Sequence, residues 1–470
     1  MHIEQIYTNC LAQGAYFIES DGEAAVIDPL RETEPYIRRA KEKGVKIKYI
    51  FETHFHADFV SGHLDLAKKT GAQIIYGPEA KTEFEKYDAK DGEEFKIGKL
   101  TLKVLHTPGH TIECSTFLLF DEEGKEHAIF TGDTLFIGDV GRPDLSQNGS
   151  DLTQEILAGW LFDSLRHKIM PLPDDVLVYP AHGAGSACGK NMSLETWSTL
   201  GDQKKTNYAL RADMSKEEFV QEVTEGLAPP PQYFAKNAQL NKGGYQSIDT
   251  VMDTGNKALQ LAEFMSIIEQ EDILLLDVRA KDVFVKGFIP GSIFIGLDGS
   301  FAPWVGALIE DITQKIVFIA PEGREEETVR RLARVGYDNT LGYLEGGYST
   351  WVNAYQDIDH IPTIQASEFT EKYKEGALSV IDVRKPSEYE TKHIEGSILY
   401  PLDFINMATS VFIDPAVPHF VHCRSGYRST AAISILKRRG YDKLINVQDS
   451  FDKIANNNLP LEGSCPSLIA

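Results

Sequence analysis

The stretch Glu52–His63, ETHFHADFVSGH, carries His54, His56 and Asp58 at alternate positions directly after an apolar run. Two histidines separated by one residue at the end of a strand can face the same metal ion. In the motif HxHxDH the aspartate is followed by a further histidine, but here Phe59 stands in that place. The stretch is therefore either a damaged two-metal site or an intact site for one metal.

Three more candidate ligands follow apolar runs further along the chain. His110 lies in the turn TPGHT, Asp133 ends the run HAIFTGD, and His182 follows VYPA. Polar residues at the ends of buried strands are where a packed sheet can present a site. Histidines and carboxylates that leave positions open for water suit Zn, Fe or Mn. A lone HxH would be weak support, but HxHxD, TPGHT and TGDTLF in this order predict a metal site.

A candidate nucleophile lies near the end of the chain, in HFVHCRSGYRSTAAISILKRRGYD. An apolar run delivers Cys423 to a short loop, and a helix is expected to begin near Ser429. Backbone N–H groups of such a loop and the positive end of a helix favour the thiolate, which is the reactive form of cysteine. Arg424 and Arg428 add formal positive charge. The loop therefore predicts a catalytic group made of Cys423, Arg424 and Arg428.

The elements that must position the metal residues are short apolar runs, separated by polar or glycine-containing turns. Helices closed by glycine are expected at EPYIRRAKEKG and SGHLDLAKKTG. Strands are expected at AAVIDP, IKYIFETH, AQIIYG, LTLKVLHTPGH, STFLLF, HAIFTGD and DVLVYPAHG. The pattern predicts a sheet-rich α/β domain over residues 1–250.

An internal repeat fills most of the remaining chain. ILLLDVRAKDVFVKGFIPGSIFIGLD (273–298) and LSVIDVRKPSEYETKHIEGSILYPLD (378–403) share DVR, Ile, GS and LD at the same spacing. Each copy alternates strands with helices, which predicts two small α/β domains with parallel sheets. We expect one of them over residues 251–358 and the other over residues 359–470.

The first repeat has no cysteine at the matching place. When the repeats are aligned on the downstream GYD, Cys423 falls on Ile319 and Arg428 falls on Arg324. Three consecutive glutamates follow, so the loop would repel anions. We interpret this repeat as an inactive domain with a packing or interaction role.

Composition and charge restrict the partners. The chain has 470 residues, 70 of them acidic and 47 basic, and a net charge of -23. This balance disfavours nucleic acid and anionic membrane surfaces. No apolar run approaches the ~20 residues of a membrane-spanning helix, and no signal-peptide pattern opens the chain. Five scattered cysteines fit a reduced cytoplasm better than a disulfide scaffold.

HxHxD, TPGHT and TGDTLF together resemble the metallo-β-lactamase fold, in the branch that holds glyoxalase II hydrolases and persulfide dioxygenases. The resemblance covers residues 1–250 and implies an αββα sandwich with the site at one edge of the sheets. Dinuclear hydrolases of this fold build a second site from the aspartate and histidine of the motif and a late histidine. Asp58 and His182 remain here, but Phe59 cannot bind a metal, so a second ion should bind weakly or not at all.

Resemblance to the persulfide dioxygenases implies one Fe(II) per chain, held by His54, His110 and Asp133. Two histidines and one carboxylate leave positions open for dioxygen and for a sulfur ligand. The same ligands could hold zinc after expression in a zinc-rich host. The residues that would surround the ligands and orient them are His56, Asp58 and His182.

Arg142 and Asp144, in GDVGRPDL, resemble the GRxD element beside the pocket of this family. The guanidinium of Arg142 would meet a carboxylate of a glutathione-like substrate. A structural salt bridge between Arg142 and Asp144 is the alternative. Cys188, in PAHGAGSACGK, lies either near the mouth of the pocket or buried and unreactive.

The C-x4-R-S spacing at Cys423, with the DVR and HIEGS elements before it, resembles the rhodanese sulfurtransferases. The resemblance implies that Cys423 accepts a sulfane sulfur as a persulfide. Tyrosine phosphatases use a loop that is one residue longer, so the shorter loop favours sulfur transfer over phosphate chemistry.

Two sulfur-related sites on one chain predict a persulfide dioxygenase fused to a rhodanese. The iron site would oxidise a low-molecular-weight persulfide, such as glutathione persulfide, with O2 to sulfite, and Cys423 would move sulfane sulfur between thiosulfate and a thiol. Two alternatives stay open: a glyoxalase II-type thioester hydrolase with Zn, and a sulfur-carrier protein with a structural metal. A homodimer is possible, since the fold often assembles into dimers.

Overall fold

The computed structural model describes residues 1–146, 151–376, 378–407 and 413–463. Contacts divide the chain into two units. The first is Met1–Asp249 with Ala333–Gly336, and the second is Thr250–Leu332 with Tyr337–Ala470. The three predicted domain ranges stay predictions, because the second unit contains both repeats. Among the described helices, none is long and apolar enough to cross a membrane.

The first unit contains two six-stranded sheets. The strands of the first sheet, in chain order, are β1 (His2–Thr8), β2 (Gln13–Ser20), β3 (Glu23–Ile27), β4 (Lys46–Glu52), β5 (Gln73–Tyr76) and β6 (Tyr87–Asp88). The strands of the second sheet are β7 (Glu94–Ile97), β8 (Leu100–His106), β9 (Ser115–Phe120), β10 (Glu126–Gly132), β11 (Leu177–Pro180) and β12 (Ser198–Thr199). Each sheet keeps its strands in sequence order from one edge to the other.

The two sheets pack face to face around one buried core. The ring of Phe51 on β4 lies against that of Phe117 on β9, with centroids 5.0 Å apart. Tyr16 on β2 meets Phe130 on β10 at 4.9 Å. Fully burying one such ring contributes about 1.5–3 kcal/mol, so these alternating aromatic positions hold the sheets together.

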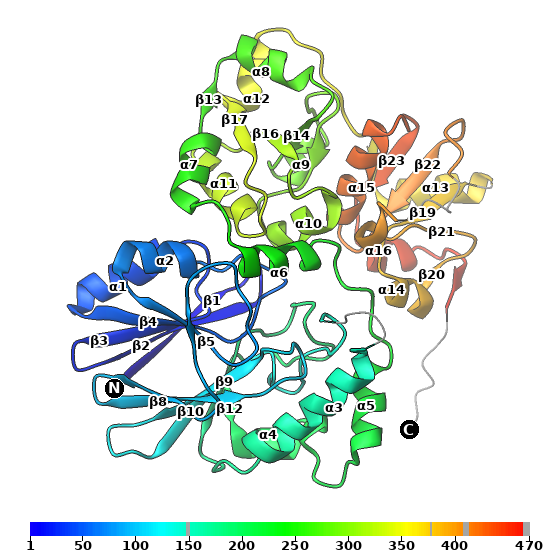
Figure 1. The fold of residues 1–470 in the computed structure, drawn as a ribbon. Helices are drawn as coiled ribbons and strands as arrows, with labels where there is room; N and C mark the ends of the chain where they lie inside the picture. Colours follow the sequence, from blue (N-terminus) through cyan, green and yellow to red (C-terminus); the bar gives the residue numbers. More distant parts are fainter. Residues whose placement is uncertain (147–150, 377, 408–412, 464–470) are drawn as a thin grey trace. The chain divides into compact units, whose positions relative to one another are not determined.

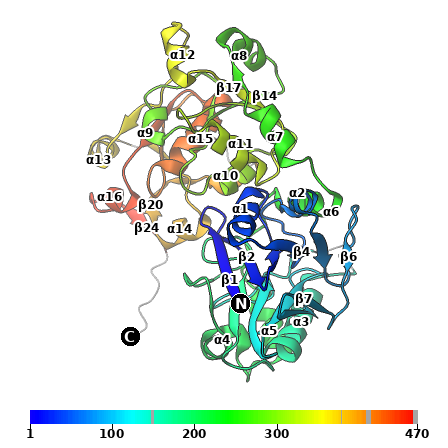
Figure 2. The same ribbon diagram turned by 90° about the vertical axis from the view of Figure 1, so that its left-hand side faces the viewer.

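Helices cover the outer faces of both sheets. Figures 1 and 2 show α1 and α2 over the first sheet, and Figure 1 shows α3 and α5 on the far side of the second. The helical elements of this unit are α1 (Glu34–Lys43), α2 (His63–Thr70), α3 (Gln154–Ser164), η1 (Leu165–Ile169), α4 (Leu200–Thr206), η2 (Tyr208–Leu210), α5 (Lys216–Thr224) and α6 (Phe234–Gly243). As predicted, α1 and α2 end at Gly44 and Gly71, both left-handed. The expected αββα sandwich is confirmed.

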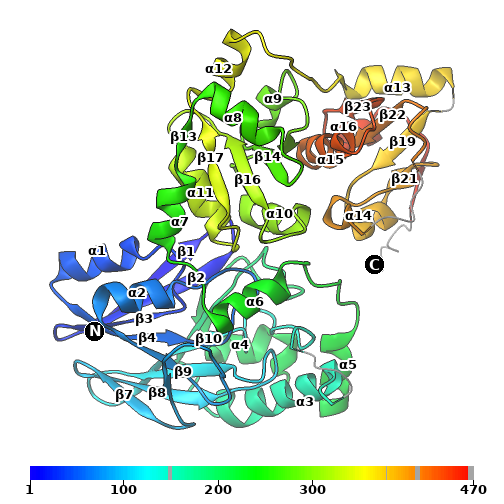
Figure 3. The same cartoon turned by 45° about the horizontal axis from the view of Figure 1, so that its top comes forward.

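The second unit contains two five-stranded sheets, one for each repeat. Their strand orders are β13-β17-β16-β14-β15 and β18-β23-β22-β19-β21. Every neighbouring pair in both sheets is parallel, which confirms the predicted parallel α/β pattern. Figure 3 shows β14 beside β16 and β19 beside β22.

The elements of the first repeat follow α7 (Ile248–Gly255). They are β13 (Ala258–Leu259), α8 (Leu261–Ile268), β14 (Ile273–Asp277), α9 (Lys281–Phe284), β15 (Ile293–Phe294), α10 (Phe301–Leu308), β16 (Lys315–Ile319), α11 (Glu325–Ala333), β17 (Thr340–Leu344) and α12 (Gly347–Asn353).

The elements of the second repeat include a small antiparallel pair, β20 with β24. They are β18 (Thr363–Ile364), α13 (Ala366–Glu375), β19 (Ser379–Asp382), α14 (Pro386–Thr391), β20 (His393–Ile394), β21 (Ile398–Leu399), η3 (Leu402–Phe404), β22 (His419–His422), α15 (Tyr427–Arg438), β23 (Leu444–Val447), α16 (Phe451–Ala455) and β24 (Leu461–Glu462).

Candidate metal centre and cysteine loop

The predicted metal ligands meet in the first unit. His54 follows β4, His110 lies after β8, and Asp133 follows β10. Each is buried and offers one ligand atom within 4.8 Å of the others. The Oδ2 atom of Asp133 lies 3.7 Å from Nε2 of His54 and 3.3 Å from Nε2 of His110. Residues that are far apart in the sequence therefore form one compact donor set.

Hydrogen bonds fix which nitrogen of each ligand histidine is free. The Thr53 hydroxyl donates to Oδ2 of Asp28 at 2.9 Å, so it accepts from Nδ1–H of His54, also at 2.9 Å. Nδ1–H of His110 donates to the backbone carbonyl of Arg142 at 2.8 Å. With Nδ1–H donated in this way, the neutral form of each imidazole has its lone pair on Nε2, which is the arrangement that a metal ligand needs.

The charge state of the trio fits a cation. Burial lowers the pKa of His54 well below its ordinary value, and the neighbouring His56 lowers it further. Burial opposes ionisation of Asp133, but its charge interaction with His182 is the largest of the effects that hold its pKa far below the usual range. Its Oδ2 atom is buried and has no hydrogen-bond partner among the described residues. An unpaired carboxylate oxygen facing two imidazole nitrogens fits a divalent metal ion.

His182 connects the trio to Asp58. Its Nδ1 lies 2.8 Å from Oδ1 of Asp133, and its Nε2 lies 2.8 Å from Oδ2 of Asp58. Burial lowers the pKa of His182, but the two carboxylates outweigh burial and raise it well above 6.5. His56, Asp58 and His182 also bring ligand atoms within 4.8 Å of one another. The three residues predicted to surround the ligands do lie together, and their orienting role stays a prediction.

Phe59 has a defined place beside this group. Its fully buried ring stacks on the His56 imidazole. Nε2 of His56 faces Asp28 Oδ1 at 3.1 Å and Glu52 Oε2 at 3.7 Å. Asp28 and Glu52 were not predicted as partners of the site, although each stands at the end of an apolar strand, as the predicted ligands do.

The alternative for Arg142, a salt bridge, is present in the structure. Its guanidinium forms a two-pronged pair with Asp144 at 2.7 and 2.8 Å. It also donates to the carbonyls of Ala187 and Ala228. These contacts favour the structural interpretation, and the substrate-binding role of Arg142 stays a prediction.

Cys188 is buried next to the predicted ligand Asp133. A ligand atom of Cys188 lies within 4.8 Å of those of Asp133 and His182. Burial raises the pKa of the Cys188 thiol well above its usual value, and the two nearby aspartates raise it further. Cys188 was expected either near the mouth of the pocket or buried, and the structure shows it buried.

A cleft of about 850 Å³ opens beside His110. Aromatic side chains on it include Phe55 and Phe234. Its charged lining residues are two lysines and four acidic residues, Lys81, Lys242, Glu79, Glu83, Glu113 and Asp144. The cleft reaches a predicted metal ligand, and its two lysines are the groups on it that suit an anionic part of a small molecule.

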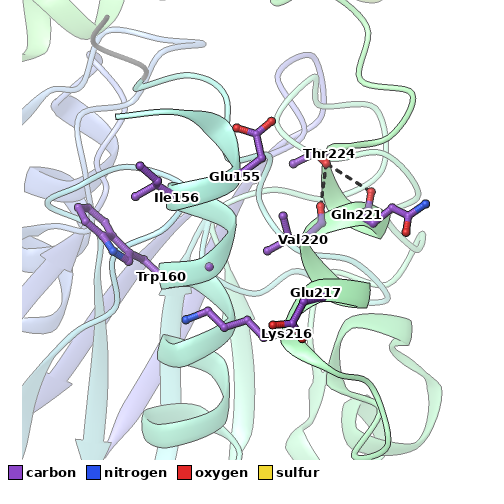
Figure 4. Close-up of a pocket in the computed structure, with 9 residues that line it drawn as sticks. Glu155, Ile156, Trp160, Lys216, Glu217, Val220, Gln221 and Thr224 are labelled. Atoms are coloured by element: carbon purple, nitrogen blue, oxygen red, sulfur yellow. Dashed lines mark hydrogen bonds between the residues drawn. The ribbon is translucent and has the colours of Figure 1, made fainter. Parts of the chain in front are cut away.

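A second groove, of about 570 Å³, lies between α3 and α5 (Figure 4). Its lining includes Ile156 and Trp160 on α3 and Val220 on α5. Its nine described lining residues include neither His nor Cys. The groove therefore lacks the residue types of the metal centre.

In the second unit, β22 delivers Cys423 to its loop as predicted. The thiol is fully buried and accepts a hydrogen bond from the backbone N–H of Gly426 at 3.1 Å. Its other contact is with the hydroxyl of Ser429 at 3.6 Å. The following helix begins at Tyr427, two residues before the predicted start, because Gly426 at φ 84° completes the turn there.

The two arginines of this loop differ in their surroundings. Arg428 forms a two-pronged ion pair with Glu388, with N to O distances of 2.6 and 3.0 Å. Arg424 is exposed. The charge of Arg428 is thus largely balanced by Glu388, and the catalytic roles of both arginines stay predictions.

The strand register corrects the alignment of the two loops. Asp277 pairs with Ile319 in the first repeat, and Asp382 pairs with His422 in the second. The residue that matches Cys423 is therefore Ala320, and Ile319 was the wrong match.

The one-residue shift in the alignment arises in the helical segment between the loop glycine and the GYD of each repeat. Gly323 and Gly426, both with positive φ, stand at equivalent places in the two loops. The segment from this glycine to the GYD is one residue longer in the second repeat, so alignment on GYD shifts the loop. Arg428 then corresponds to Glu325 rather than Arg324. The first loop still lacks a cysteine.

Comparison with known families agrees with both parts of the fold. The model of the metallo-beta-lactamase superfamily matches residues 9–182. The model of the rhodanese-like domain matches residues 260–354 and 365–457. The chain belongs to the metallo-β-lactamase superfamily and continues into two rhodanese-like domains, as the sequence predicted.

Individual relatives narrow this class. The chain is 34% identical over 229 residues to human "Persulfide dioxygenase ETHE1, mitochondrial", which covers 47% of this chain and 80% of that protein. It is 28% identical over 230 residues to "Hydroxyacylglutathione hydrolase GloC" of Haemophilus influenzae, with 44% of this chain and 97% of the relative covered. Relatives of both kinds support an enzyme of this superfamily.

A solved structure extends the likeness beyond the first unit. The crystal structure titled "Metallo-beta-lactamase from Staphylococcus aureus subsp. aureus COL" is 32% identical to this chain, with a TM-score of 0.64. The match covers 73% of this chain and 98% of that one. It therefore includes part of the rhodanese-like region.

Proposed function

We propose that the first unit is a non-haem Fe(II) persulfide dioxygenase and that Cys423 is a rhodanese-type sulfurtransferase nucleophile. The observation that carries the proposal is the buried trio of His54, His110 and Asp133, in which one carboxylate oxygen lacks a hydrogen-bond partner among the described residues. Phe59 stands where a two-metal site would use a histidine. Persulfide dioxygenase relatives and the rhodanese-like domains support the same assignment.

The proposed oxidation converts a thiol persulfide, O2 and water into the thiol, sulfite and two protons. Bound Fe(II) would supply adjacent positions for O2 and for the sulfur of the substrate. The chain's own residues hold the ion and admit the substrate. Lys81 and Lys242, on the cleft beside His110, suit the carboxylates of a glutathione-like carrier.

The proposed transfer uses the Cys423 thiolate. The thiolate attacks the outer sulfur of thiosulfate, the S–S bond of thiosulfate breaks, and sulfite leaves with the bonding electron pair. Cys423 then carries a persulfide, whose outer sulfur passes to a thiol. The N–H of Gly426, 3.1 Å from the sulfur, suits stabilisation of both anionic forms.

Oxygen consumption tests the dioxygenase. Protein reconstituted with Fe(II) under anaerobic conditions is given glutathione persulfide, and both O2 uptake and sulfite are measured. We expect about one O2 to be consumed for each sulfite formed. The His110→Ala variant should lose its iron and, with it, O2 uptake. Iron-loaded protein that consumes no O2 would overturn the proposal. If His110→Ala leaves both O2 uptake and sulfur transfer intact, the result would instead favour a sulfur-carrier protein with a structural metal.

A Zn-dependent thioester hydrolase is the second candidate. The proximity of His56, Asp58 and His182, and the hydroxyacylglutathione hydrolases among the relatives, favour it. It predicts two metal ions per chain and hydrolysis of S-D-lactoylglutathione. Elemental analysis of the purified protein, together with this hydrolysis assay, separates the two candidates.

A further inference from the structure

The Cys423 loop is held by residues of the repeat that has no cysteine. Both repeats belong to the second unit of the chain. Lys281, the first residue of α9, donates from its ammonium group to the backbone carbonyl of Ser425 at 2.7 Å. The contact joins residues 144 positions apart in the sequence. It places a positive charge from the first repeat directly on the loop of the second.

The carbonyl that Lys281 binds belongs to the peptide unit that faces the sulfur. Ser425 C=O and Gly426 N–H are the two ends of one planar trans peptide, so they point in opposite directions. The N–H end donates to Sγ of Cys423 at 3.1 Å. Fixing the carbonyl on one side therefore fixes the direction of the N–H on the other.

Close packing leaves this peptide little freedom. A Cβ atom placed on Gly426 would lie 3.2 Å from Nζ of Lys281 and 2.9 Å from the carbonyl oxygen of Gln448. Gly426 also has φ 84°, in the left-handed region that glycine adopts without strain. The loop thus has a glycine where both the backbone conformation and its neighbours require one.

Two more contacts from the first repeat hold the flanks of the loop. The Tyr427 hydroxyl donates to the carbonyl of Gly296 at 3.2 Å, and its ring lies 5.3 Å from that of Phe294. The Gln448 amide donates to Asp282, the residue after Lys281, at 3.0 Å. The first repeat therefore contacts the loop on several sides. Among its described side chains, that of Lys281 is the one with a hydrogen bond to the peptide that faces Cys423.

We propose that Lys281 is a positioning residue for sulfur transfer at Cys423, so that the cysteine-less repeat forms part of the nucleophile's site. A charge-assisted hydrogen bond to the carbonyl polarises the peptide and strengthens its N–H as a donor. The stronger donor stabilises the thiolate and, after transfer, the anionic persulfide. The inference rests on the proposed sulfurtransfer for its reaction, but its effect on thiolate reactivity does not depend on the sulfur donor.

Other charged groups around the loop are arranged differently. Arg428 is paired with Glu388, Arg424 is exposed, and Asp282 accepts from Gln448. His422 is buried, and burial lowers its pKa. Asp382 is paired with Arg384. Among the described charged side chains, Lys281 is the one with a hydrogen bond to the Ser425–Gly426 peptide.

The test is the pH dependence of Cys423 alkylation by iodoacetamide in the full-length protein, followed by peptide mass spectrometry. Lys281→Met should move the midpoint of the rate profile upward by about 0.5–1 pH unit, because an anion-stabilising donor is weakened. Lys281→Arg should restore most of the shift. Lys286→Met, at an exposed lysine of the same repeat, is the matched control and should leave the midpoint unchanged.

Sulfurtransfer is measured beside alkylation. In Lys281→Met, kcat for transfer from thiosulfate should fall several-fold at pH 7, while O2 uptake at the metal centre stays unchanged. A midpoint equal to that of the unaltered protein would overturn the role of Lys281. If Lys281→Met fails to fold, Lys281→Gln, which retains a neutral donor, should give a smaller upward shift of the alkylation midpoint. An unchanged midpoint in Lys281→Gln would equally overturn the role of Lys281. Absence of transfer in the unaltered protein would overturn the proposed function instead, and the alkylation profile would still decide the role of Lys281.

Discussion

The ring of Phe59 stacks on the imidazole of His56, with centroids 4.4 Å apart and planes inclined by 30°. Both side chains are fully buried. The Phe59 ring also lies near the His182 imidazole, with centroids 6.5 Å apart. It offers no lone pair at the position where the two-metal motif has a histidine. The pair therefore gives a physical reason to expect one ion per chain.

Replacing Phe59 with His tests this reason directly. The new imidazole would add a nitrogen donor near Asp58 and His182, so the metal content should rise from about one to about two ions per chain. Elemental analysis after loading with Zn or Fe measures the change. Phe59→Leu, which keeps the position apolar, should still bind a single ion. A single ion in both variants would show that Phe59 does not set the stoichiometry.

Thr53 should contribute to metal affinity without touching the metal. Its hydroxyl connects Asp28 to Nδ1 of His54, and Thr53→Val removes that connection at nearly constant shape. Partners of this kind typically account for about 10–100-fold in affinity, so chelator competition should show a loss of that size. Thr101→Val, at a buried threonine of β8, is the control. Equal affinity in the two variants would contradict the role of Thr53.

Cys423 should be the nucleophile of sulfur transfer, and the matching position of the first repeat should not replace it. Cys423→Ser should abolish transfer from thiosulfate and leave O2 uptake intact, because the two sites use different residues. Adding Ala320→Cys places a thiol at the matching position of the first repeat, where Glu325 replaces the arginine and the first turn of α11 is acidic. These carboxylates disfavour a thiolate, so the double variant should stay inactive. Recovered transfer would disprove the interpretation of the first repeat as inactive.

The Arg428–Glu388 pair should make stability depend on pH. Burial opposes ionisation of Glu388, but hydrogen bonds from Arg428 and from the Lys385 backbone outweigh it, so the pKa of Glu388 lies below its ordinary 4.5. The stabilisation is therefore fully present above pH 4.5 and is lost as the pH falls through the lowered pKa. Arg428→Met should lower the melting temperature at pH 7, at a cost of about 1 kcal/mol.

Thermal unfolding between pH 7 and pH 3 measures this dependence. The gap in melting temperature between the Arg428→Met variant and the unaltered protein should narrow as the pH falls. Glu388→Gln removes the titrating group and should show a gap that varies less with pH. A gap of constant size in Arg428→Met would mean that the ion pair does not contribute.

Much of the fold was predictable because its signals are local. Apolar runs of strand length, and glycines that close helices such as Gly44 and Gly71, identify elements within a few residues of sequence. The repeated DVR and GS elements indicated two similar parallel-sheet domains. Alignment across a whole helix was less reliable, since one extra residue between Gly426 and the GYD moved the match of Cys423 from Ala320 to Ile319.

The sequence by itself determined the residue types of both sites, because His54, His110, Asp133 and Cys423 each follow an apolar strand. Only the tertiary structure decided their partners. The bond from Lys281 to Ser425 joins residues 144 positions apart, and the pair of Arg428 with Glu388 joins residues 40 apart. No local pattern specifies such contacts, because they depend on how sheets and helices pack. That packing leaves the Nε2 lone pairs of His54 and His110 free, and it places the charge of Lys281 at the Cys423 loop.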